Sequence, residues 1–276
     1  MTRTLLITGC SSGIGACCAQ GMKARGWRVF ATARKDGDLA KLAADGLEAL
    51  YLDYADPASV AACAAEVSRR TGGRLDALFN NGAYGQPGAV EDLTRDVLRA
   101  QFETNVFGWH ELTRLCLPLM RTNGSGRIVN NSSVLGLTAM KWRGAYNASK
   151  FAIEALSDTL RLELRGTPIR VILIEPGPIA SRFTEHALAA FEANIDAENS
   201  PYRAAYLRQR ARLGRGGSKR FKLGPEAVLS KLIHALESAA PRRRYYVTIP
   251  TYIMAWARRL LPPPVLDHLL DKASDQ

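Results

Sequence analysis

Short apolar runs alternate with helix-compatible stretches along most of the chain. The first run, residues 3–8, leads into a glycine-rich turn, and the second, residues 27–33, follows a helical stretch. Further apolar runs lie at residues 47–53, 75–81, 126–133 and 169–177. Strands that are buried on both faces are apolar almost throughout, so this pattern predicts parallel strands with helices between them. Right-handed crossovers then give an α/β fold, a doubly wound parallel sheet with helices on both faces.

The second half of the chain departs from this alternation. Residues 182–222 have a helix-forming composition rich in Ala and Arg but no strand run, so we expect an insertion that covers the substrate as a lid. A helix is expected near residues 225–238 and a strand near residues 244–249. The 276 residues are enough for one large core, and we expect a single domain over residues 1–276.

The tail, residues 250–272, is apolar but interrupted. Arg258 and Arg259 divide it and three prolines follow, so it lacks the ~18 uninterrupted apolar residues that cross a bilayer. One helical face could carry its apolar side chains Ile253, Met254, Trp256 and Leu260. We expect this face to pack on the protein itself or on a second subunit, with peripheral contact to an anionic membrane surface as the alternative.

The net charge of +11 is compatible with nucleic acid, an anionic lipid surface, an anionic cofactor or a merely solvated basic face. Residues 203–222 carry eight Lys or Arg and no Asp or Glu. Aromatic residues are sparse in that stretch and the chain has no recognisable nucleic-acid motif, so we expect no nucleic-acid partner.

The number and spacing of the cysteines indicate whether the protein holds a metal or disulfides, and in which compartment it works. Their number, five, is odd, and no two have paired metal-ligand spacing, so we expect neither a disulfide framework nor a metal site. A reducing, cytoplasmic location fits best. The apolar residues 5–7 are too few for the apolar region of a secretion signal.

Three glycines, Gly9, Gly13 and Gly15, lie between the first strand run and the first helical stretch. Without side chains, they allow a tight bend and let a pyrophosphate approach the backbone N–H groups at the helix start. The spacing suits a dinucleotide, whereas the alternative is an ordinary tight turn.

Six motifs follow one another along the chain: TGCSSGIG (8–15), NNGA (80–83), TNVFG (104–108), NSSVLG (131–136), YNASK (146–150) and EPGPIAS (175–181). Together they resemble the short-chain dehydrogenase/reductase family in order and spacing. The resemblance implies a single-domain Rossmann fold, a nicotinamide cofactor, a small-molecule substrate and a homo-oligomer, either dimer or tetramer. It also implies a catalytic tetrad of Asn105, Ser133, Tyr146 and Lys150. The implied cofactor contacts are Gly9, Ser11, Ser12, Gly13, Ile14, Gly15, Arg34, Asp53, Asn81, Gly82, Tyr146, Lys150, Pro176, Gly177, Ile179 and Ser181.

The tyrosine and the lysine of the tetrad are four residues apart and share one face of the expected helix. A free tyrosine has a pKa of about 10, so roughly one in a thousand is ionised at pH 7. A cation within about 4–6 Å favours the ionised form, and Lys150 would supply one, reinforced by an oxidised nicotinamide. The alternative is a Tyr and a Lys that merely share a solvated face.

The other two members of the tetrad also have alternatives. The family serine precedes the tyrosine by thirteen positions, which selects Ser133, while Ser132 is expected to serve the turn or a cap. Asn105 resembles the family residue that holds a water in a proton relay to the lysine. It could instead mark a kink or cap within a helix.

Cofactor choice is set after the second strand run, where NAD enzymes usually carry an acidic residue for the ribose 2′-OH. Here Arg34 and Lys35 offer cations to a 2′-phosphate, and Ser12 adds a hydroxyl. We therefore expect NADP(H), with NAD(H) as the alternative because Asp36 follows. Asp53 resembles the family aspartate that contacts the adenine.

The expected reaction is hydride transfer between the nicotinamide and a carbonyl carbon, with Tyr146 as the proton donor and Ser133 as a hydrogen-bond donor. Tyr84, Met140 and Trp142 are expected near the pocket, where they suit a lipophilic, steroid- or retinoid-like substrate unless they simply pack. The alternative functions are reduction of a 3-oxoacyl thioester and regulation by NADP(H) binding without turnover.

Overall fold

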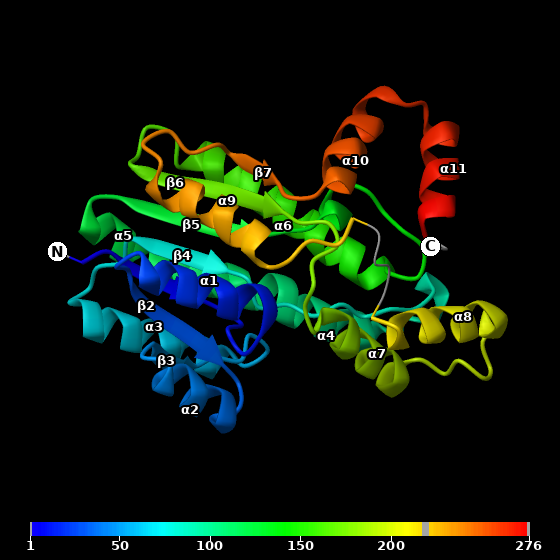
Figure 1. Ribbon diagram of the computed structural model, residues 1–276, viewed down its shortest axis with the longest axis horizontal. Helices are drawn as coiled ribbons and strands as arrows, with labels where there is room; N and C mark the ends of the chain where they lie inside the picture. The colour runs from blue at the N-terminus through cyan, green and yellow to red at the C-terminus, as the bar shows by residue number, and fades with distance from the viewer. Residues whose placement is uncertain (1, 217–220, 275–276) are drawn as a thin grey trace.

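Seven parallel strands form one sheet within residues 2–216 and 221–274, the part of the chain that the computed structural model describes (Figure 1). Their order is β3-β2-β1-β4-β5-β6-β7. The strands are β1 (Thr4–Ile7), β2 (Arg28–Ala33), β3 (Glu48–Tyr51), β4 (Ala77–Asn80), β5 (Gly126–Asn131), β6 (Ile169–Glu175) and β7 (Arg244–Tyr246). The chain runs outward from β1 to β3 and then returns to β4, so the order reverses between β1 and β4, where open sheets bind ligands. This confirms the α/β, doubly wound parallel sheet.

Helices cover both faces of the sheet because each turns an apolar side toward it. One face is packed by α1 (Gly13–Ala24), α2 (Asp36–Ala44) and α9 (Glu226–Glu237). The other is packed by α3 (Pro57–Thr71), α5 (Gly108–Asn123) and α6 (Gly144–Glu163). The central strand β1 is fully buried, and its side chains alternate between the two cores, with Leu5 and Ile7 on one face and Leu6 on the other.

Several expected strand runs extend past the observed strands at their carboxyl ends. Those extra residues leave the sheet to form loops at its edge: Asn81 follows β4, Ser132 and Ser133 follow β5, and Pro176 follows β6. The strand expected over residues 244–249 is also shorter, because α10 already begins at Ile249. Apolar character alone does not separate a strand from the turn that follows it.

The remaining helices lie beyond the carboxyl ends of the strands, at the right of Figure 1. They are α4 (Arg95–Phe102), α7 (Phe183–Asn194), α8 (Arg203–Gly214), α10 (Ile249–Leu260) and α11 (Pro263–Ser274). A small core of Ala89, Phe191, Ile195 and Tyr206 joins α7 and α8 to the loop after β4. Of the basic stretch 203–222, residues 217–220 lie outside the described residues.

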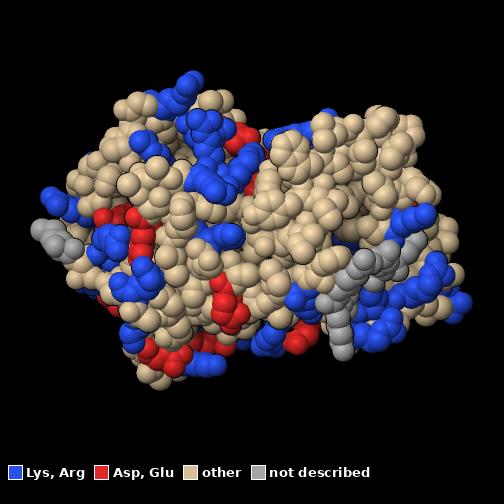
Figure 2. All heavy atoms as spheres, turned by 45° about the horizontal axis from the view of Figure 1, so that its top comes forward, with Lys and Arg blue, Asp and Glu red and all other residues tan. Residues whose placement is uncertain are grey.

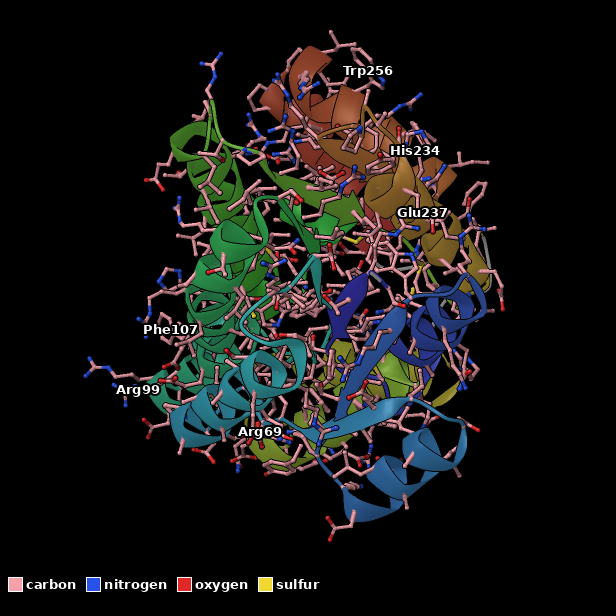
Figure 3. All side chains as sticks on the ribbon, turned by 90° about the vertical axis from the view of Figure 1, so that its left-hand side faces the viewer. Arg69, Arg99, Phe107, His234, Glu237 and Trp256 are labelled. Carbon is pink, nitrogen blue, oxygen red and sulfur yellow. The ribbon has the colours of Figure 1, made fainter. Side chains whose placement is uncertain are left out.

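Charge is unevenly spread over the surface. Figure 2 shows a face on which Lys and Arg outnumber Asp and Glu, beside a wide uncharged area over α10 and α11. Trp256 stands on α10 at the outer edge of the molecule and is 58% exposed (Figure 3). Among the described helices, none is both long enough and apolar enough to cross a bilayer.

Candidate active site

The glycine turn between β1 and α1 has no room for side chains. Gly9 has φ +68°, and a Cβ there would lie 2.6 Å from the Cα of Gly82. A Cβ on Gly15 would lie 2.1 Å from the carbonyl oxygen of Gly9. The helix start after Ser12 carries no side-chain cap, so its backbone N–H groups are not capped by the Ser12 hydroxyl. Uncapped N–H groups at a helix start suit a phosphate.

A cavity of about 1230 Å³ opens at this turn and extends along the carboxyl edge of the sheet. It is large enough for a dinucleotide together with a substrate, since ordinary ligand pockets measure about 300–1000 Å³. Most of the expected cofactor contacts line it: Gly9, Ser11, Ser12, Gly13, Ile14, Arg34, Asp53, Asn81, Gly82, Tyr146, Lys150, Pro176, Gly177, Ile179 and Ser181. Gly15 is not in the wall and instead lets α1 pack closely on the turn.

Tyr146 lies in the first turn of α6, and Ser133 follows β5, so both reach the same cavity from different elements. Burial raises the pKa of Tyr146 to about 12, against the opposing effects of the Ser133 hydroxyl and the charge of Arg143. The Ser133 Oγ also accepts a hydrogen bond from the Leu135 backbone N at 3.1 Å. The cap role that the sequence assigned to Ser132 therefore belongs to Ser133, because Ser133 begins the 3₁₀ turn Val134–Gly136.

Lys150 is 1% exposed and sits behind the tyrosine. Its Nζ donates to the Asn131 backbone oxygen at 2.8 Å and lies 4.4 Å from the centre of the Trp109 ring. Burial lowers the pKa of Lys150 to about 7, although the charge of Glu154 one helical turn away raises it. The site therefore holds a tyrosine that is protonated and a lysine that changes charge near neutral pH.

Asn105 lies in a π-helical turn, Glu103–Phe107, between α4 and α5. It is fully buried and does not line the cavity. Its Nδ2 donates to the Tyr84 backbone oxygen at 2.9 Å and to the Ser149 Oγ at 3.2 Å. The side chain thus fixes the Tyr84 loop against α6, and single π turns are frequent at functional sites.

The cofactor end contains an ion pair that the sequence did not indicate. Arg34 Nη1 lies 3.6 Å from Asp53 Oδ2, so the expected 2′-phosphate cation contacts the expected adenine residue. Burial and then Arg182 lower the pKa of His186, with Arg34 and Lys35 adding to the same effect. Several cations therefore gather around one part of the cavity wall.

At the substrate end, the expected residues Tyr84, Met140 and Trp142 all line the cavity. Trp142 has φ +64°, an unusual conformation for a bulky residue, and its ring contacts that of Tyr202 edge-on at 5.2 Å. Both the insertion and the tail contribute walls, from Phe183, Ala187, Gln209, Arg212, Leu213, Pro250, Ile253, Met254, Leu270 and Ala273.

The wall residues that sequence reasoning did not name include Arg143, Phe183 and Arg212. The Phe183 ring meets the Tyr146 ring edge-on at 5.3 Å. Arg143 is three residues before the tyrosine, and this proximity was a signal that could have found it. Within the described residues, no three His, Cys, Asp or Glu side chains are grouped as metal ligands.

The parallel sheet, the glycine turn and the Ser, Tyr and Lys side chains around one cavity define a nicotinamide-dependent oxidoreductase. The short chain dehydrogenase family model matches residues 3–190, and the chain belongs to this family. It is 42% identical over 270 residues to the uncharacterized oxidoreductase YbbO of Escherichia coli K12, covering 98% of this chain and 94% of that protein. It is 34% identical to human 17-beta-hydroxysteroid dehydrogenase type 1, covering 90% and 78% of the two chains.

A solved structure supports the same assignment. A short chain dehydrogenase/reductase from Burkholderia phymatum, in complex with NAD, matches with a TM-score of 0.78 and 28% identity. The match covers 98% of this chain and 95% of the other. The chain is therefore an oxidoreductase of this family that works with a nicotinamide cofactor.

Proposed function

We propose that the protein is an NADP(H)-dependent oxidoreductase that interconverts a carbonyl and a primary or secondary alcohol on a lipophilic substrate. The observation that carries this proposal is the convergence of Ser133, Tyr146 and Lys150 on the cavity that begins at the glycine turn. The wall of that cavity is largely apolar at the substrate end, where Trp142, Phe183 and Leu213 lie. A named steroid dehydrogenase among the relatives agrees with a lipophilic substrate.

The residues around the glycine turn would hold a nicotinamide cofactor, which would supply or accept the hydride. In the reductive direction, the Tyr146 hydroxyl donates its proton to the carbonyl oxygen, to which the Ser133 hydroxyl donates a hydrogen bond. A pKa of about 12 keeps Tyr146 protonated at neutral pH, which suits a proton donor. In the oxidative direction, the charge of Lys150 would help Tyr146 to lose its proton. Asn105 holds the Tyr84 loop behind this group.

The experiment is a screen of NADPH oxidation against ketones, aldehydes, steroids and acyl thioesters, with Tyr146→Phe as the matched variant. We expect turnover on lipophilic carbonyl compounds, and a loss of about 10²-fold or more in kcat with little change in cofactor binding for Tyr146→Phe. Near-normal turnover by the variant would reject the mechanism. Cofactor binding without turnover on any substrate would favour the regulatory alternative.

The preference for NADP(H) is proposed from the charges near Arg34. Arg34, Arg182 and His186 line the cavity, and the charges of Arg34, Lys35 and Arg182 all act on His186. Such a group of cations would bind a 2′-phosphate well. The related structure with NAD supports a nicotinamide cofactor but does not bear on the 2′ position in this chain.

The lid is also part of the proposal. Residues 182–222 and the tail 250–272 would cover the substrate, because α7, α8, α10 and α11 all contribute to the cavity wall. Closure of such segments excludes water from the reaction. We treat residues 1–276 as one short-chain dehydrogenase domain.

Location and assembly complete the proposal. The described cysteines are all free thiols, which suits a reducing cytoplasm. The outer face of α10, with Ile249, Trp256 and Leu260 at 59%, 58% and 71% exposure, would rest on an anionic membrane surface. A homodimer or tetramer would form elsewhere, near the exposed Phe107 (Figure 3).

A further inference from the structure

Two guanidinium groups stand in the cavity wall at the substrate end, those of Arg143 and Arg212. Arg143 directly precedes α6, and Arg212 lies in the last turn of α8. Burial lowers the pKa of Arg143 to about 9, and the charge of Arg212 is the next cause. Burial also lowers the pKa of Arg212. Both side chains line the same cavity and the charge of Arg212 acts on Arg143, which still carries its own charge at pH 7.

Neither arginine has an acidic partner among residues 2–216 and 221–274. The Nη1 of Arg143 donates to the Met140 Sδ at 3.1 Å, and the Nε of Arg212 donates to the Gln209 Oε1 at 3.2 Å. These contacts are with neutral atoms of residues three positions away in the sequence. Each guanidinium group has five N–H donors, and most of these donors have no acceptor among the residues that the structure describes.

Two exposed arginines of the same insertion have acidic partners. Arg203 lies 2.7 Å from Glu198, and Arg210 lies 2.9 Å from Glu192. Those pairs are at the surface, where water solvates a charged side chain even when it has no partner. Arg212 faces the cavity and has no acidic partner among the described residues, although a partly buried charge needs a partner more than an exposed charge does.

Two adjacent, half-buried cations without a carboxylate are unfavourable because each is partly desolvated and each repels the other. An anion between them would remove both penalties. Guanidinium groups bind carboxylates and phosphates through paired hydrogen bonds. The same wall also holds apolar groups, among them Trp142, Leu213 and Met254.

We propose that Arg143 and Arg212 bind an anionic group, a carboxylate or a phosphate, on an otherwise apolar carbonyl substrate. The carbonyl would lie at Tyr146, and the apolar part of the substrate would lie against Trp142, Leu213 and Met254. This inference rests on the proposed function, whose substrate it describes more closely: an acidic amphiphile rather than a neutral lipid.

The cofactor's own phosphates do not account for this pair of cations. The pyrophosphate cradle is the turn between β1 and α1, and the proposed 2′-phosphate site is at Arg34, after β2. Arg143 instead directly precedes α6 and Arg212 lies in α8, and both line the cavity together with Trp142 and Leu213. Substitutions at the pair should therefore leave the KM for NADPH unchanged.

The test compares 12-oxododecanoic acid with its methyl ester in NADPH-dependent reduction. Arg143→Met and Arg212→Met should each raise the KM for the acid roughly tenfold, because each removes a charged hydrogen bond, and should change the KM for the ester little. Arg143→Lys should recover part of the acid's affinity. Arg208→Met is the matched control, because Arg208 lies in α8 like Arg212 but is exposed and is not in the cavity wall.

A third probe, 12-oxododecyl phosphate, distinguishes the two anions, since the group that the site prefers should have the lower KM in the wild type. Equal KM values for acid and ester in the wild type, or equal effects of the variants on both, would overturn the anion site while the proposed reaction stands. If no probe is reduced, the NADP-loaded protein is tested by thermal shift with dodecanoate. A shift that Arg143→Met and Arg212→Met abolish would support the anion site even though the proposed function had failed, and no shift would overturn both.

Discussion

At the scale of single residues, Arg34 has two competing partners. Its Nη1 lies 3.6 Å from Asp53, and its side chain is 64% exposed, so an incoming phosphate can compete for it. An exposed ion pair of this kind contributes little stability, so its rearrangement costs little. A doubly charged 2′-phosphate would be the stronger partner.

We therefore expect Arg34→Asp to shift the cofactor preference from NADP(H) toward NAD(H) by at least about tenfold in the ratio of kcat/KM values, because it replaces an attraction with a repulsion. Arg74→Asp is the control, since Arg74 is exposed before β4, at the opposite edge of the sheet. An unchanged ratio in Arg34→Asp would refute the assignment of NADP(H) to this residue.

A second residue-scale prediction concerns Glu175, which is fully buried at the end of β6. Burial and the neighbouring Glu154 raise the pKa of Glu175 from 4.5 to about 8, even though Arg244 Nη1 donates to it at 2.6 Å. The folded protein thus keeps a proton that the unfolded chain releases above pH 4.5. The contribution of Glu175 to the free energy of unfolding is therefore full below pH 4.5 and is lost as the pH rises toward 8.

The Tm of the wild type should therefore fall between pH 5 and pH 7.5 by more than the Tm of Glu175→Gln, which keeps the shape but cannot ionise. Thermal unfolding of both proteins across that range is the measurement, with Glu163→Gln on the exposed end of α6 as the control. Parallel Tm profiles for wild type and Glu175→Gln would show that Glu175 does not titrate in this window.

The sequence could place Ser133, Tyr146, Lys150 and most of the expected cofactor-contacting residues around one cavity because most of them lie in contiguous motifs, whereas Asn105 is buried outside the cavity wall. Tyr146 and Lys150 share one helix, and Ser133 follows a strand that the apolar run already marked. Arg212 could not be predicted, because its place depends on how α8 folds back over the cavity. Nothing local distinguishes it from Arg208 or Arg210 in the same basic stretch.

At the scale of elements, the turn between β1 and α1 depends on glycine for two separate reasons. Gly9 needs a positive φ, whereas Gly15 needs space for the approach of the helix to the turn. A Cβ on Gly15 would meet the Gly9 backbone oxygen at 2.1 Å and the Asn81 Nδ2 at 2.8 Å. Because the first contact is with backbone, it cannot be relieved by a side-chain rotation.

Gly15→Ala should therefore push α1 away from the turn, lower the Tm and weaken cofactor binding about tenfold or more, as measured by NADPH fluorescence titration. Gly37→Ala is the matched control, because a Cβ there meets nothing within 4 Å in α2. That change should leave binding unaltered and raise stability by roughly 0.5–1 kcal/mol, since Ala is the better helix former. Normal cofactor affinity in Gly15→Ala would contradict the proposed cradle.

The individual strands and helices were easier to predict from sequence than the way in which the helices cover the cavity. The apolar runs located β1 to β6 because a buried parallel strand has few polar positions, and the Tyr–Lys spacing correctly indicated α6. The arrangement of α7, α8, α10 and α11 over the cavity depends on contacts between distant segments. Lys141 N, for example, donates to the Ser274 Oγ at 3.0 Å across 133 positions in the sequence.

At the scale of the whole molecule, the cations behind the net charge of +11 lie in several different places. Cations around Arg34 and at Arg143 and Arg212 face the cavity, where both the cofactor and the proposed substrate are anionic. Others lie on the outer surface beside the uncharged area over α10 and α11 (Figure 2). A basic rim around an apolar patch is the arrangement that binds anionic lipid headgroups.

The outer face of α10 provides the last prediction. Ile249, Tyr252, Trp256 and Leu260 are 44–71% exposed and follow one another at helical spacing. Full-length protein should float with vesicles that contain phosphatidylserine at low salt. It should float much less at high salt, because salt screens the charges of Arg258 and Arg259 near the end of α10. Vesicles of neutral phosphatidylcholine alone should retain little protein.

Trp256→Ser and Leu260→Ser should each reduce flotation several-fold, since each removes apolar area from the contact, while Val90→Ser, on an exposed apolar residue elsewhere, should not. All variants should keep wild-type turnover on a soluble aldehyde, because neither Trp256 nor Leu260 lines the cavity. If the wild type ignores anionic vesicles and light scattering shows a dimer that Trp256→Ser dissociates, the face is a subunit interface and membrane contact is wrong. Flotation that all three variants retain equally would place the lipid contact on the basic surface and not on α10.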